Sequence, residues 1–125
     1  MRIVIETIPH NCQRYNTVGD WQFDADGNLT VRVSEMNDSR YEFLVGIHEA
    51  IEAVCARHAG IAEAEVDAFD IEYENNRAEG DMSEPGDDPR CPVYRQHQIA
   101  TAVEKLLAVE LDVGWKEYDV VVNAL

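Results

Sequence analysis

A long helix with clear start and stop signals, expected at about residues 39 to 59, constrains the fold of this chain more than any other feature. Its apolar positions recur at helical spacing and define the expected core face: Leu44, Ile47, Ile51 and Val54. The run Ser39-Arg40-Tyr41-Glu42 matches a capping box, in which Glu42 reaches back to the cap residue. Gly60 then supplies the usual terminator. These signals predict a helix that is buried along one face.

Several other segments have the pattern of β-strands. Residues 3 to 8 are mostly apolar and are followed by Pro9. Residues 21 to 24 and 29 to 33 are predicted to form a hairpin, because Asp26-Gly27 between them supplies the positive φ of a tight turn. Apolar and polar residues alternate over 29 to 33, which indicates one buried face. Residues 118 to 122 are expected to close the sheet as a last strand.

The rest of the chain predicts two more helices and one long loop. Residues 61 to 75 fit both a helix and a strand, and a short helix is favoured. Residues 76 to about 91 form an acidic loop rich in proline and glycine, and loops of this length are either functional or disordered. A second long helix follows from Pro92 to about Leu111. Its expected core face consists of Ile99, Val103, Leu106 and Leu107.

These elements together predict one α+β domain over residues 1–125, because 125 residues suffice for one good core and not for two. Its sheet is expected to be small and antiparallel, built from the N-terminal strand, the hairpin and the C-terminal strand. Two long helices and one short helix are expected to cover it.

The chain carries a net charge of −15, which limits its partners. Such a surface repels phosphate groups, so general binding to nucleic acid and docking on anionic membranes are not expected. The same field attracts cations, and a basic protein or peptide is the expected partner. Halophilic adaptation, or mimicry of nucleic acid by an inhibitor, would produce the same charge.

The cysteines and the N-terminal residues indicate a cytoplasmic protein. The three cysteines lie far apart and form no C-x-x-C pair, which is typical of free thiols in a reducing compartment. Glu6 interrupts the apolar run that a signal peptide would need, and no stretch approaches the length of a membrane span.

Two pairs of histidine and glutamate form a candidate metal site. His48 and Glu52 lie one turn apart at the flank of the first apolar stripe, where an imidazole and a carboxylate can bind one divalent cation. His97 and Glu104 lie two turns apart on the second long helix. If the helices pack side by side, these four groups can meet. The alternative is an exposed ion pair between His48 and Glu52, worth a few tenths of a kcal/mol.

The run His48-Glu49-Ala50-Ile51-Glu52 resembles the H-E-x-x-H helix of the zincin metallopeptidases, with glutamate in place of the second histidine. The preceding strand at residues 29 to 33 is also similar to that family. The resemblance implies that His48 and Glu52 are zinc ligands and that Glu49 is the general base of a hydrolase. His58 lies where one branch of the family has its third histidine, but Gly60 ends the helix too soon, so His97 is preferred as the further ligand.

The chain also resembles small proteins encoded by phages and prophages, through the H-E-x-x-E helix, the P-G-D-D-P loop and the Q-H-Q helix. The leading hypothesis is a zincin-like metal-binding protein of this type, with zinc as its metal, and whether it hydrolyses peptide bonds stays an open question at this point. A second hypothesis is a non-enzymatic acidic accessory protein that binds a basic host partner. A third is a structural component of a virion, which would self-assemble.

Overall fold

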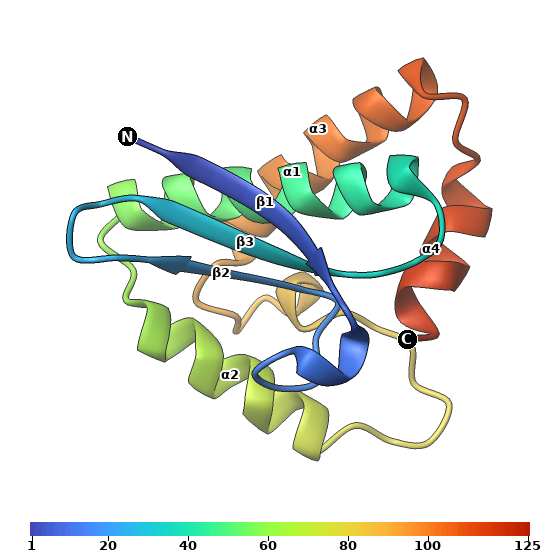
Figure 1. Ribbon diagram of the computed structural model, residues 1–125. Coiled ribbons are helices and arrows are strands. Elements are labelled where there is room, and N and C mark those ends of the chain that lie inside the picture. The colour runs from blue at the N-terminus through green and yellow to red at the C-terminus, as the bar shows by residue number, and fades with distance from the viewer.

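The computed structural model describes residues 1–125 and confirms the α+β class. Figure 1 shows a three-stranded sheet with four helices. The strands are β1 (Ile3–Ile8), β2 (Gly19–Phe23) and β3 (Leu29–Ser34), and the helices are α1 (Ser39–His58), α2 (Glu63–Asn75), α3 (Tyr94–Glu110) and α4 (Trp115–Asn123). Two single 3-10 turns, η1 (His10–Cys12) and η2 (Pro85–Asp87), lie in the connections. No helix combines the length and the apolar character that a membrane crossing requires.

The sheet has the strand order β1-β3-β2, with β3 in the centre. The predicted hairpin is confirmed, because β2 and β3 are antiparallel, with Trp21 opposite Val31, and Gly27 has a φ of 80° in the turn. β1, however, runs parallel to β3, so the expected all-antiparallel sheet is wrong. The chain leaves β1 at one edge, passes through η1 and enters β2 at the other edge, which places the start of β2 beside α1 (Figure 1).

α1 packs across the sheet and begins and ends within one residue of the predicted positions. Its cap differs from the predicted capping box. Asp38, and not Ser39, accepts a hydrogen bond from the Arg40 backbone N–H, while the Glu42 carboxylate accepts one from the Met36 N–H. Both bonds satisfy backbone donors at or just before the start of the helix. The helix is therefore capped by side chains as predicted, but the cap residue is Asp38, one position before Ser39.

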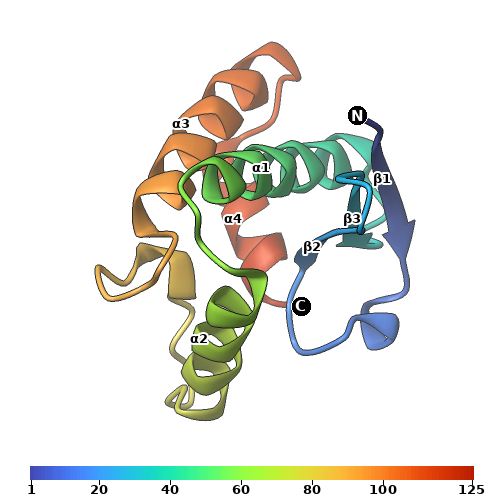
Figure 2. The same cartoon turned by 90° about the vertical axis from the view of Figure 1, so that its left-hand side faces the viewer.

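The buried face of α1 is rotated away from the predicted stripe. Leu44 is buried as expected, but Ile47 and Ile51 are half-buried and Val54 is 39% exposed. The buried positions are Leu44, Val45, Gly46, His48, Glu52, Ala53 and Ala56. The reason is that α1 is covered twice, by the sheet on one side and by α3 on another (Figure 2). His48 and Glu52, expected at the flank of the stripe, therefore lie inside.

α3 packs mainly against α1 and the η2 turn, and its predicted core face is wrong in part, because Leu107 packs against the core while two other predicted positions are exposed. Ile99 is 43% exposed and Leu106 is 72% exposed. The buried residues of α3 are His97, Ala100, Glu104 and Ala108. The two small alanines allow α1 and α3 to approach closely, and the two polar side chains find partners across the interface. An apolar stripe on the outer face of α3 misled the sequence-based assignment.

The last element is the helix α4, so the predicted closing strand over residues 118 to 122 is wrong. Gly114 is its N-cap residue, and Trp115, Tyr118 and Val122 follow at the spacing of one helical face. These three side chains pack against the core, and Tyr118 is fully buried. The ambiguous residues 61 to 75 form the helix α2, as favoured.

Candidate metal centre

A pocket of about 230 Å³ lies between α1 and α2 and is bordered by β2, by the chain before it and by the loop that carries η2. Its lining includes most of the histidine and acidic residues that the sequence singled out, together with carboxylates from α2 and the loop. The residues that concern its chemistry are His48, Glu49, Glu52, Asp70, Glu84, His97 and Glu104.

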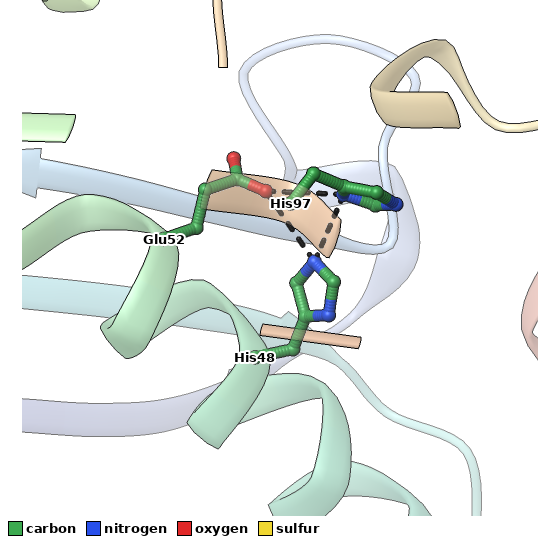
Figure 3. A group of neighbouring side chains, drawn as sticks. All are labelled: His48, Glu52 and His97. Atoms are coloured by element: carbon green, nitrogen blue, oxygen red, sulfur yellow. Dashed lines mark hydrogen bonds and ion pairs between the residues drawn. The ribbon is translucent and has the colours of Figure 1, made fainter. Parts of the chain in front are cut away.

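His48, Glu52 and His97 converge on one point in this pocket, although α1 and α3 lie far apart in the sequence (Figure 3). His48 Nε2 lies 3.1 Å from His97 Nδ1. Glu52 Oε2 lies 3.3 Å from His48 Nε2 and 3.1 Å from His97 Nδ1. All three residues are buried, each with 7% of its surface exposed. The structure thus brings together the three residues predicted as metal ligands.

The spacing of the three donor atoms fits a tetrahedral divalent ion. Ligand atoms at about 2.0–2.1 Å from a tetrahedral zinc lie about 3.4 Å from one another. The measured edges of the triangle are 3.1, 3.1 and 3.3 Å, so an ion above its plane needs only small side-chain shifts. Two imidazoles and one carboxylate are also the donor types that catalytic zinc sites use, with one position left for water or substrate.

Each imidazole uses its second nitrogen to bind a carboxylate outside the triangle. His48 Nδ1 lies 2.7 Å from Glu104 Oε1, and the Tyr118 hydroxyl donates to Glu104 Oε2 at 2.5 Å. A carboxylate in this place fixes the tautomer and the orientation of a metal-binding histidine. Glu104, expected among the metal-capable groups, therefore lies behind the three candidate ligands and orients His48.

His97 is oriented in the same way by the loop between α2 and α3. Its Nε2 lies 3.2 Å from Glu84 Oε2 and 3.4 Å from Asp87 Oδ1. Gly86 packs against the imidazole face so closely that a Cβ at this position would overlap the ring. Asp87 also accepts a hydrogen bond from Gln98 at 3.0 Å. The η2 turn is therefore a support for His97, which gives the long acidic loop a structural role at the site.

The imidazoles and the carboxylates at the triangle stabilise each other's charged forms, which shifts their pKa values. Burial alone would lower the pKa of His97, but its contacts with Glu52 and Glu84 raise it to about 9. Burial would likewise lower the pKa of His48, but Glu104 and Glu52 raise it well above 6.5. Burial would raise the pKa of Glu52, and the two imidazoles lower it to about 2. Without a metal, protonated His48 and His97 form ion pairs with the carboxylates around them.

Glu49 lies in the same pocket, next to His48 in sequence. It is half-buried, although its position opposite the predicted apolar stripe favoured a fully solvated side chain. Its side chain rests on the backbone of Gly19 at the start of β2, where a Cβ would lie 2.7 Å from Glu49 Cγ. Burial and the charge of Glu52 raise the pKa of Glu49 well above 4.5. Glu49 therefore holds a proton more readily than a solvated glutamate does.

Two other residues of α1 with metal-binding side chains lie outside the site. His58 is exposed at the end of the helix, and the half-buried Cys55 does not line the pocket. Sequence reasoning missed Glu84, whose place in the acidic Glu84-Pro85-Gly86 segment was the only signal available. It also missed Tyr118, because that residue was assigned to a strand. In comparisons with known proteins, the chain matches no protein-family model, no curated protein and no solved structure.

Proposed function

We propose that this protein is a zincin-like, zinc-dependent hydrolase that cleaves peptide bonds. The observation that carries the proposal is the triangle of His48 Nε2, Glu52 Oε2 and His97 Nδ1, with edges of 3.1 to 3.3 Å inside a pocket. An ion pair alone would need one histidine and one carboxylate. Two imidazole nitrogens that face the same carboxylate oxygen, each with its other nitrogen bound to a further acid, match the requirements of a metal site.

Two residues of the chain supply what hydrolysis needs beside the metal. A zinc ion held by the triangle supplies Lewis-acid chemistry, which acidifies water and polarises a carbonyl group. Glu49 is the general base, which takes the proton of the attacking water and delivers it to the leaving amine. Its raised pKa suits the role of base, because it makes the Glu49 carboxylate a stronger proton acceptor than a solvated glutamate.

A peptide as substrate agrees with the position of β2 beside the pocket. β2 is an edge strand, and Gly19 at its start lies against the Glu49 side chain. Because Gly19 has no Cβ, the Glu49 side chain can pack against its backbone, which places the proposed general base beside the edge strand. An extended peptide can pair with an edge strand, and because the Phe23 N–H is already bonded to Glu63 of α2, such a peptide is expected at the Gly19 end of β2.

The test is hydrolysis of a peptide library by zinc-loaded protein prepared without a histidine tag, read by mass spectrometry. Glu49→Gln keeps the shape of the side chain and removes the base, so cleavage should fall by about 10²–10⁴-fold while zinc stays bound. Glu65→Gln, an exposed glutamate of α2 that does not line the pocket, is the matched control and should cleave normally. Equal cleavage by wild type and Glu49→Gln, or none by wild type, would refute the proposed activity.

A further inference from the structure

α2 forms the acidic wall of the pocket opposite α1, and three of its four pocket-lining carboxylates are bonded to other groups of the protein. Glu63 accepts a hydrogen bond from the Phe23 backbone N–H at 2.6 Å. Asp67 lies 3.1 Å from an Arg14 guanidinium nitrogen, and Glu74 lies 2.7 Å from an Arg77 guanidinium nitrogen. These residues line the pocket, but their charges are already used to hold α2 in place.

Asp70 is the exception on this wall. It is half-buried and lines the pocket, and its one side-chain partner is the Tyr15 hydroxyl, which donates at 3.2 Å. No lysine, arginine or histidine forms an ion pair with it. Burial and the negative charge of Glu52 raise the pKa of Asp70 to about 7. A carboxylate in such surroundings is stabilised by any cation that enters the pocket.

The protein has no spare cation of its own for Asp70. Arg77 is the only lysine or arginine that lines the pocket, and its guanidinium is held by Glu74 and by the Asp81 and Ser83 carbonyl groups. Arg14 is held between Asp20 and Asp67. The net charge of −15 adds a long-range field of the same sign. No lysine or arginine of the chain is therefore free to pair with Asp70, and a bound ligand can supply that contact.

We propose that Asp70 binds the cationic side chain of a substrate, so that the pocket selects peptides with lysine or arginine near the bond to be cleaved. This specificity rests on the proposed hydrolase function, because Asp70 and the triangle share one pocket. The pocket of about 230 Å³ gives a long, flexible basic side chain room to reach α2 while its backbone lies at Glu49 and His48. The Tyr15 hydroxyl orients the carboxylate for this contact.

The test uses three peptides that differ only at one position, with lysine, norleucine or glutamate, presented to zinc-loaded wild type, Asp70→Asn and Glu65→Gln. Wild type should prefer the lysine peptide over the norleucine peptide by at least about tenfold, and Asp70→Asn should lose most of that preference. Norleucine has nearly the same length without the charge, so it separates charge from size. Glu65→Gln makes the same change in net charge on the same helix and should keep the preference.

The readouts separate this inference from the hydrolase proposal. Binding of the same peptides is measured by calorimetry, so the charge preference can be scored even if no peptide is cleaved. Equal binding of the lysine and norleucine peptides by wild type would overturn the role of Asp70, and so would a preference that Asp70→Asn retains. A loss of bound zinc in Asp70→Asn would also overturn it, because Asp70 would then act on the metal. Asp70→Asn should unfold at the same temperature as wild type or higher, since it removes a half-buried carboxylate that has no cationic partner.

Discussion

His48 Nδ1 and Glu104 Oε1 lie 2.7 Å apart across the interface of α1 and α3, and this contact sets the direction in which His48 presents its other nitrogen. The Tyr118 hydroxyl donates to the second oxygen of Glu104, which links α4 to the same arrangement. Three helices thus determine the position of one imidazole. A histidine that only filled space in the core would not need so many constraints.

The first prediction concerns this support. Glu104→Gln leaves the shape of the side chain almost unchanged but removes the negative charge behind His48, so zinc affinity should fall by about 10–100-fold. Tyr118→Phe removes only one hydrogen bond to Glu104 and should have a smaller effect. Competition with a chromophoric chelator measures both affinities. Unchanged affinity in Glu104→Gln would mean that Glu104 does not orient a metal ligand.

The second prediction concerns the η2 turn. Gly86→Ala should displace the His97 ring, because the added Cβ would overlap it, and zinc affinity should fall by about tenfold or more. The control is a double-mutant cycle with His97→Ala. Once the ring is gone, the Cβ has room, and Gly86→Ala should have no further effect on zinc binding. Additive losses in the double variant would show that Gly86 acts elsewhere.

The third prediction concerns protons. At pH 7 the metal-free protein holds protons on His48 and His97, since their carboxylate neighbours raise both pKa values, that of His97 to about 9. Zinc needs both imidazoles unprotonated at the coordinating nitrogens, so binding should release about one to two protons per ion. Calorimetry in buffers of different ionisation enthalpy counts them. Binding without proton release would contradict the assignment of these ligands.

The fourth prediction follows from the same pKa values for the metal-free fold. Protonated His97 has partners in the folded state that it lacks when unfolded, so its pKa rises from 6.5 to about 9 on folding. Its contribution is fully present below pH 6.5 and is lost as the pH rises through about 9. Denaturation in the presence of a chelator should therefore show stability falling over this range, and the fall should be smaller in His97→Gln. A zinc-loaded sample should not show the same fall.

Sequence patterns predicted the local elements well where several signals agreed. α1 has a cap region, apolar spacing and a terminating glycine, and the β2–β3 hairpin has a turn with Gly27, so both were placed correctly. The strand prediction for residues 118 to 122 was wrong because Tyr118 and the valines that follow it have a high intrinsic preference for strands. These residues instead form the helix α4, because the core-facing side chains are spaced for a helix and Gly114 serves as its N-cap residue.

The candidate site could be predicted only in part, for a physical reason. Periodicity identifies which residues share a face of a helix, so His48 with Glu52 could be recognised. It cannot show which face of α3 meets α1, and the apolar Ile99 and Leu106 pointed to the wrong one. The meeting of His97 with His48 was therefore a conditional prediction. The role of Glu84 depends on the path of a loop, which no periodic pattern encodes.

The most direct test of the central claim is the zinc content and affinity of untagged protein, measured by chelator competition for wild type and for single alanine variants. Wild type should bind one zinc ion per chain, and His48→Ala and His97→Ala should each weaken binding by more than about 100-fold. His58→Ala, which removes an exposed histidine of α1, should bind zinc as wild type does. If wild type binds no stoichiometric zinc, or if His48→Ala and His97→Ala bind it as well as His58→Ala does, the triangle is an ion-pair cluster and the proposed metal centre is wrong.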